Sequence, residues 1–137
     1  MASGIYNRLK YNLMKKLVDL SADTINVMLL TSSHAFNADH NVKVDIDANE
    51  ISGTGYTAGG ADLTNKTVTQ DDTNDRAVFD ADDVSWTSAT FTARHAALND
   101  VTASNNLLCS IDFGTDKSVT AGTFTIQWAS AGIIRLT

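Results

Sequence analysis

Three histidines and one cysteine are the side chains of this sequence best suited to metal binding or nucleophilic chemistry. His34 and His40 lie in a polar stretch, and His95 lies in an apolar, threonine-rich stretch. The spacing from His34 to His40 matches no standard zinc motif, and a second cysteine is lacking. We therefore expect no metal site, with His34 and His40 as polar loop residues and His95 half-buried in a strand.

Cys109 lies inside the apolar run Leu107–Ile111. An apolar setting raises the pKa of a thiol and keeps it unreactive, so this position favours a buried, inert cysteine. A single cysteine also excludes an intramolecular disulfide.

Acidic residues form the next candidate group, because paired carboxylates bind hard cations. Asp45, Asp47 and Asn49 match the first three ligand positions of a calcium loop, but Glu50 replaces the required glycine and Tyr56 the bidentate glutamate. Two further clusters could bind a cation weakly, although solvated turn residues are the favoured interpretation. They are Asp71, Asp72 and Asp75, and Asp80, Asp82 and Asp83.

No catalytic motif emerges from the remaining residues. The glycines in 53–60 lack the Gly-Lys-Ser/Thr that completes a phosphate loop, and no Gly-x-Ser-x-Gly elbow occurs. A Ser–His–Asp grouping cannot be inferred from residue order, and paired carboxylates for glycoside chemistry stay open. One glutamate and 7% aromatic residues make a sugar cleft unattractive. We expect no enzyme activity, no catalytic residues and no cofactor.

The composition is that of one acidic globular domain. The chain has 137 residues, 43% of them hydrophobic, and a formal net charge of −6. The charge argues against a nucleic-acid partner, which needs clustered Lys and Arg. No apolar stretch approaches the roughly 20 residues that span a membrane, and residues 1–20 lack a signal-peptide pattern. We expect synthesis in a cytoplasm and no membrane partner.

An amphipathic helix is predicted at the N-terminus, within residues 1–22. Ile5, Leu9, Leu13 and Leu17 recur every four residues, and Ser3 could cap the helix start. The apolar stripe over 4–20 must pack either across an interface or against the chain's own sheet. Both alternatives stay open.

The remainder of the chain favours β structure. Thr24–Thr31 predicts a buried strand, and 32–63 a long loop or arm with a short element near Val42–Ile46. In the main β region, 64–137, short threonine-rich strands alternate with Asn, Asp, Ser and Gly turns. The predicted strands are Thr67–Gln70, Arg76–Phe79, Val84–Trp86, Thr90–Leu98, Leu107–Phe113, Gly122–Trp128 and Ile133–Leu136. The prediction is a mainly β, antiparallel sandwich or jelly-roll-like single domain over 1–137, with Trp86 and Trp128 in its core.

Several stretches together resemble a widespread group of small virion proteins of tailed bacteriophages, over nearly the whole chain. They are Thr24–Leu30 after an N-terminal helix, Gly55–Gly60 running into Leu63–Thr69, Phe79–Trp86, Ile111–Gly114, Gly122–Trp128 and Ile133–Leu136. Some members of this group are capsid cement or decoration proteins with a jelly-roll-like sandwich. The resemblance implies no catalytic motif.

The resemblance implies a decoration protein that binds the outer surface of the major capsid protein lattice and stabilises the head. The alternatives are a tail or neck structural protein and a host-surface-binding module. We expect a virion location, the major capsid protein as partner, and a homodimer rather than a homotrimer. The candidate interaction residues are Tyr6, Arg8, Lys10, Lys15, Lys16, Phe36, His40 and Tyr56.

Overall fold

A short, almost wholly apolar strand lies in the middle of the fold. In the computed structural model, which describes residues 3–137, Ile25–Leu30 forms strand β2, and five of its six residues are buried. Alternate side chains of a strand point to opposite faces, so this strand needs apolar cover on both sides of its sheet. The burial confirms the strand predicted over Thr24–Thr31.

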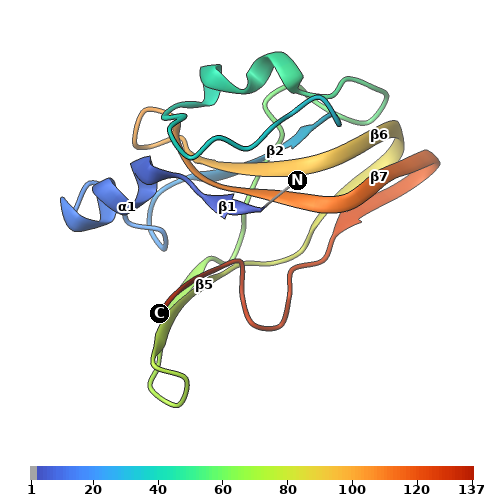
Figure 1. Cartoon of the computed structure of the whole chain (residues 1–137). Helices are drawn as coiled ribbons and strands as arrows, with labels where there is room; N and C mark the ends of the chain where they lie inside the picture. Colours follow the sequence, from blue (N-terminus) through green and yellow to red (C-terminus); the bar gives the residue numbers. More distant parts are fainter. Residues whose placement is uncertain (1–2) are drawn as a thin grey trace.

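Two antiparallel sheets and one N-terminal helix make up the described chain, which confirms the predicted mainly β, sandwich-like fold (Figure 1). The larger sheet has the order β1-β7-β6-β2-β3 and the smaller one the order β4-β5-β8. The helix is α1 (Asn7–Met14), and two 3₁₀ helices, η1 (Lys43–Asp45) and η2 (Asp47–Asn49), follow β2. The strands are β1 (Gly4–Ile5), β2 (Ile25–Leu30), β3 (Ala61–Asp62), β4 (Thr67–Asp71), β5 (Arg76–Asp80), β6 (Val84–Asp100), β7 (Asn106–Ile126) and β8 (Ile134–Leu136).

One face of the larger sheet is covered by the helix and the base of the smaller sheet. Leu9 of α1, Phe79 of β5 and Ile134 of β8 are all buried against this face. Only this end of the smaller sheet contributes to the core. The hairpin of β4 and β5 projects away from the larger sheet, toward the bottom of Figure 1.

The opposite face is covered by the long polar stretch after β2. Its two 3₁₀ helices lie across the sheet (Figure 1), and Ile46 and Phe36 pack on Met28, Leu30 and Leu107. Residues 32–63 are therefore a folded layer and not an extended arm. The η1 helix falls inside the predicted element Val42–Ile46.

Strands β6 and β7 form one long hairpin, although the sequence predicted four separate strands. The expected turn around Ser88 is a bulge, in which Ser88 has a φ of 49° and the register with β7 shifts between Trp86 and Ala89. An extra residue in one strand is accommodated in this way without ending the ladder. Gly114, with a φ of 84°, lies at a second such irregularity within β7, where the register shifts between Ala93 and His95.

Helix α1 is shorter than the predicted helix within residues 1–22. Gly4 and Ile5 pair with β7 instead, and the Ser3 hydroxyl accepts a hydrogen bond from Asp112 N–H rather than capping the helix. The helix ends where Lys16 takes a φ of 57°, which turns the chain into a Schellman-type end. In that turn Leu17 N–H donates to the Asn12 carbonyl. Residues 1 and 2 of the predicted helix lie outside the described residues.

A close approach between the loop before β3 and strand β2 generates a stability prediction. Gly60 has a φ of 85°, and a Cβ at this position would collide with the Val27 carbonyl. Gly114 has a nearly equal φ of 84°, but a Cβ there meets nothing within 4 Å. We expect Gly60→Ala to lower the free energy of unfolding by at least ~3 kcal/mol, because backbone must move. Gly114→Ala should cost only about 1 kcal/mol, the strain of a left-handed conformation.

Urea unfolding of both variants measures this difference. Equal losses for the two variants would show that the contact with Val27 contributes nothing beyond backbone strain.

Candidate interaction surfaces

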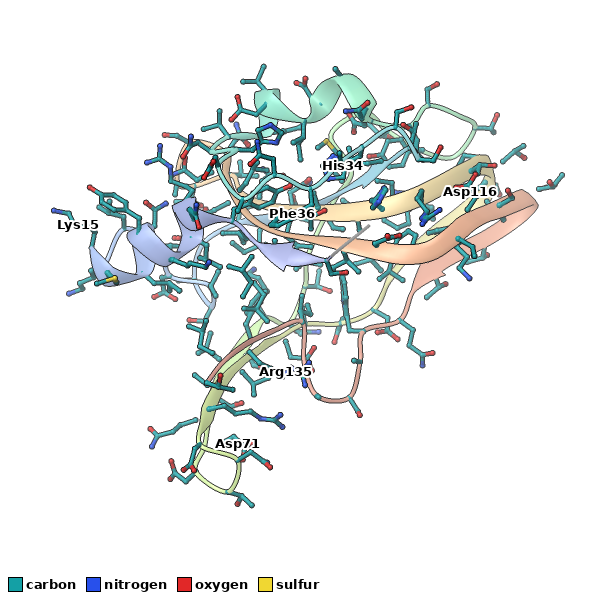
Figure 2. The ribbon with its side chains drawn as sticks, in the orientation of Figure 1. Lys15, His34, Phe36, Asp71, Asp116 and Arg135 are labelled. Carbon is teal, nitrogen blue, oxygen red and sulfur yellow. The ribbon has the colours of Figure 1, made fainter. Side chains whose placement is uncertain are left out.

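The C-terminal end of α1 exposes large apolar side chains among lysines. Tyr11, Met14 and Leu17 have 52%, 90% and 53% of their surfaces exposed. Lys10, Lys15 and Lys16 are exposed on the same turns, and Figure 2 shows Lys15 at the outer limit of the molecule. We call these six residues the helix-end patch. No acidic residue occurs between Asn7 and Val18, so the patch is apolar and basic.

The first turn of α1 is tied to the stretch after β2. Arg8 Nε donates to Asn41 Oδ1 at 3.2 Å, and Phe36 packs against the Tyr6 ring with centroids 5.0 Å apart. Tyr6 has no exposed surface, and burial raises its pKa to about 12. Of the predicted interaction residues, Tyr6, Arg8 and Phe36 thus gather at this junction, and His40 directly precedes Asn41 in the chain. Tyr6 itself belongs to the core and offers no contact surface.

Tyr56 holds the loop before β3 against β2. Its hydroxyl donates to Glu50 Oε1 at 2.7 Å and accepts from Leu29 N–H at 3.0 Å. Its ring packs against Trp86 and Phe91 with centroids 6.0 and 5.9 Å away. Glu50 also accepts from Gly59 N–H at 2.6 Å, so the only glutamate stabilises this loop.

Two apolar grooves flank the smaller sheet. The larger, of about 660 Å³, is lined by Phe113, Phe124, Trp128 and Ile133, with Lys117 and Arg135 also on its wall. Trp128 follows the end of β7 and is half-buried, with its Nε1 donating to the Asp82 carbonyl. It packs against the margin of the core and also lines the groove, so its predicted core position is only partly met.

The smaller groove, of about 360 Å³, lies between the segment after α1 and the smaller sheet. Leu13 and Val18 line one side, and Val68, Phe79 and Leu136 the other. Val68 and Leu136 keep 51% and 42% of their surfaces exposed, so the apolar wall is open to solvent.

The two predicted loop and strand histidines meet in a buried polar cluster. His34 and His95 are each 2% exposed, and their rings meet edge to face with centroids 5.1 Å apart. His34 Nε2 lies 3.1 Å from Ser110 Oγ, and His95 Nδ1 lies 3.1 Å from the Thr31 carbonyl. His34 is therefore not the polar loop residue that we predicted, because the stretch after β2 folds over the sheet and encloses it.

Arg94 and Asp112 border this cluster. Arg94 Nε donates to Asp112 Oδ1 at 2.7 Å, and the Arg94 guanidinium holds the pKa of Asp112 well below its usual range. Asp112 Oδ1 lies 3.7 Å from His95 Nε2, beyond hydrogen-bond distance. Ser110 is 1% exposed. A serine nucleophile needs substrate access, and this Ser–His pair is closed to solvent.

The acidic clusters are occupied by contacts within the chain. Asp45 Oδ2 accepts from the N–H groups of Asn41 and Val42, and Asp71 pairs with Arg76 at 2.8 Å. Asp82 accepts from Asn65 Nδ2 at 2.6 Å. Among residues 3–137, no group of three or more His, Cys, Asp or Glu side chains is arranged to hold a metal ion. Cys109 is buried, and burial raises its pKa to about 12, as expected for an inert thiol.

Comparisons with family models, with curated proteins and with solved structures find no match. In the described part of the chain, no helix is long and apolar enough to cross a membrane.

The buried histidine predicts a loss of stability in acid. Burial lowers the pKa of His34 to about 4 from 6.5. Between these values the unfolded chain binds a proton that the folded chain excludes, so stability falls as the pH drops from 6.5 to 4. The loss at pH 4.5 relative to pH 7 is about 2–3 kcal/mol. Asp100 opposes this change, because burial raises its pKa to about 6 and its protonated form favours the fold.

The two effects are separated by unfolding the protein and His34→Gln in urea at both pH values. Glutamine can still bond Ser110 but does not titrate, so the variant should lack the His34 part of the acid loss. If the free energies of unfolding of the two proteins fall equally with pH, His34 binds protons equally well in the folded and unfolded chain, and the prediction is wrong.

A second prediction concerns Tyr56. Tyr56→Phe leaves the Glu50 carboxylate and the Leu29 N–H without their shared partner, and we expect a loss of about 2 kcal/mol in the free energy of unfolding. Thermal and urea unfolding measure it. An unchanged stability would leave Tyr56 free for a role in contacts with another molecule.

Proposed function

We propose that this chain is a decoration protein of a tailed-bacteriophage capsid, which binds the outer surface of the major capsid protein lattice and stabilises the head. The resemblance of the sequence to small phage virion proteins supports this proposal. It is a structural role in which many weak contacts on a symmetric lattice combine into firm attachment.

The helix-end patch is the observation that carries the proposal. Met14 exposes 90% of its surface beside Tyr11 and Leu17, and Lys15 and Lys16 follow on the same end of the helix. Apolar side chains this exposed gain free energy when a partner covers them, by about 25 cal/mol for each Å² removed from water. The lysines suit an acidic partner surface and oppose contact with a basic one.

We assign the two alternatives for the N-terminal helix to different residues of the helix. Leu9 is buried against the larger sheet, so the start of the helix closes the body of its own chain. The helix-end patch is left for an external partner, which we propose to be the shell.

A catalytic role is the weaker alternative on physical grounds. Ser110 Oγ lies 3.1 Å from His34 Nε2, the arrangement of a nucleophile beside a base, but both residues are buried. A nucleophile held this way meets no substrate without opening of the layer over the sheet.

Electron cryomicroscopy of the virion that carries this chain tests the proposed location. Density that repeats over the capsid lattice, with the end of α1 facing the shell, is the expected result. Density confined to the neck or tail would overturn the decoration role and favour the connector or receptor-binding alternative.

Point variants test the patch itself. We expect Met14→Asp with Leu17→Asp to weaken binding to undecorated heads at least tenfold, because two carboxylates replace the apolar contact beside the lysines. The matched control is Val44→Asp, at an equally open apolar position (69% exposed) on the 3₁₀ layer. Co-sedimentation with heads measures the binding. Equal binding by the patch variant and the control would remove the helix end from the interface.

A further inference from the structure

Strand β4 has an unpaired outer edge. It is the first strand of the order β4-β5-β8 and, among residues 3–137, pairs with β5 alone. Four of its five residues are exposed, and its hairpin projects away from the body of the protein (Figure 1). An exposed, regular edge strand is a template for pairing with another strand.

The main-chain groups that face outward on β4 can be identified from the ladder. The Phe79 carbonyl accepts from Ile133 N–H at 2.8 Å, so the main chain of Phe79 faces the β8 side. The main-chain N–H and C=O groups of successive residues in a strand point to opposite edges. The N–H and C=O of Val78 therefore face β4. Thr69 pairs with Val78, so the main chain of Thr69 faces β5. The N–H and C=O groups of Val68 and Gln70 are then left on the open edge.

The middle of this edge lacks the usual protections against pairing, which are bulges, proline and charge. The ladder with β5 is unbroken from Thr67 to Asp71, without a bulge, and the chain contains no proline. The middle residues Val68, Thr69 and Gln70 are uncharged. The outer edge of β7 is longer, but Gly114 and Ala121 take positive φ there and interrupt its row of outward groups.

We propose that β4 pairs antiparallel with β4 of a second copy of this chain, which forms a two-fold dimer with one continuous six-stranded sheet. Only outward-facing residues can exchange hydrogen bonds, so Val68 of one copy must oppose another outward-facing residue of the second copy, such as Val68, Gln70 or Asp72. Pairing over the full strand length places Thr69 on the two-fold axis. Val68 then opposes Gln70 of the second copy, and Gln70 opposes Val68.

Charge complementarity favours this register. Lys66 immediately precedes β4 and Asp72 immediately follows it. In the Thr69-centred register, Lys66 of each copy opposes Asp72 of the other, so the dimer gains two opposite-charge pairs at its ends. A shift by two residues in either direction would place Lys66 against uncharged Gln70 or Asn74 and lose both pairs.

The apolar wall of the smaller groove would also become continuous across the axis. Val68 pairs with Phe79, and Phe79 with Ile134, so these three side chains share one face of the sheet. The exposed Val68 side chains of the two copies become diagonal neighbours in the dimer. This inference stands apart from the proposed function, since it requires no capsid.

Sedimentation velocity over a range of protein concentrations tests the dimer. The expected species has twice the 14.7 kDa mass of one chain. Gln70→Pro removes the outward-facing N–H of Gln70 but no hydrogen bond to β5. Because the dimer is two-fold symmetric, the substitution removes two hydrogen bonds between the copies, one from each chain. We expect its dissociation constant to rise at least about tenfold. Gln70→Thr keeps the N–H and should dimerise like the parent protein.

A monomer at every concentration would overturn the proposal, as would equal dimerisation of Gln70→Pro and the parent protein. Loss of the dimer in both Gln70 variants would overturn the hydrogen-bonded edge, because the threonine variant retains the N–H. Circular dichroism checks that each variant is folded.

Charge reversal provides a second test at the two residues that flank β4. Lys66→Asp and Asp72→Lys should each weaken the dimer, because each places like charges opposite one another twice. The double variant should restore it to within a few-fold of the parent affinity. A double variant as weak as the single ones would overturn the Thr69-centred register.

Discussion

The burial of β2 on both faces is the constraint on which the rest of the structure depends. Ile25, Val27 and Leu29 project into one core and Met28 and Leu30 into the other. A sheet with such a strand in its interior cannot leave either face of that strand to water. The chain therefore needs one layer on each side, and the helix, the smaller sheet and the polar stretch after β2 supply them.

Only one end of the helix and one end of the smaller sheet are buried against the larger sheet. Leu9 packs into the core, but Met14, five residues later, is almost fully exposed. Phe79 and Ile134 pack into the same core, but β4 beside them is open. Each element is fixed at one end and projects at the other. A projecting end on a rigid base can contact a neighbour at little entropic cost, which suits the lattice role and the dimer that we propose.

The polar layer over the second face is held by hydrogen bonds in addition to the apolar packing of Ile46 and Phe36. Glu50 and Tyr56 hold its end near β3, and His34 contacts Ser110 on β7. Buried polar groups without partners would destabilise the fold, so the side chains best suited to chemistry are used to hold loops in place. The same residue types that attract attention as catalytic candidates thus have structural partners here.

The sequence by itself determined the elements whose signals are local. The apolar run Thr24–Thr31, the alternation of Phe124 and Ile126 and the Asp-rich turns were sufficient to predict a mainly β, antiparallel fold, and the neighbours of Cys109 were sufficient to predict a buried thiol. Only the tertiary structure decided which residues the stretch 32–63 would enclose, why Ser88 is a bulge and not a turn, and where the helix stops. These outcomes depend on contacts between residues far apart in the chain, as between His34 and Ser110. Periodicity within one segment carries no information about which surface another segment will cover.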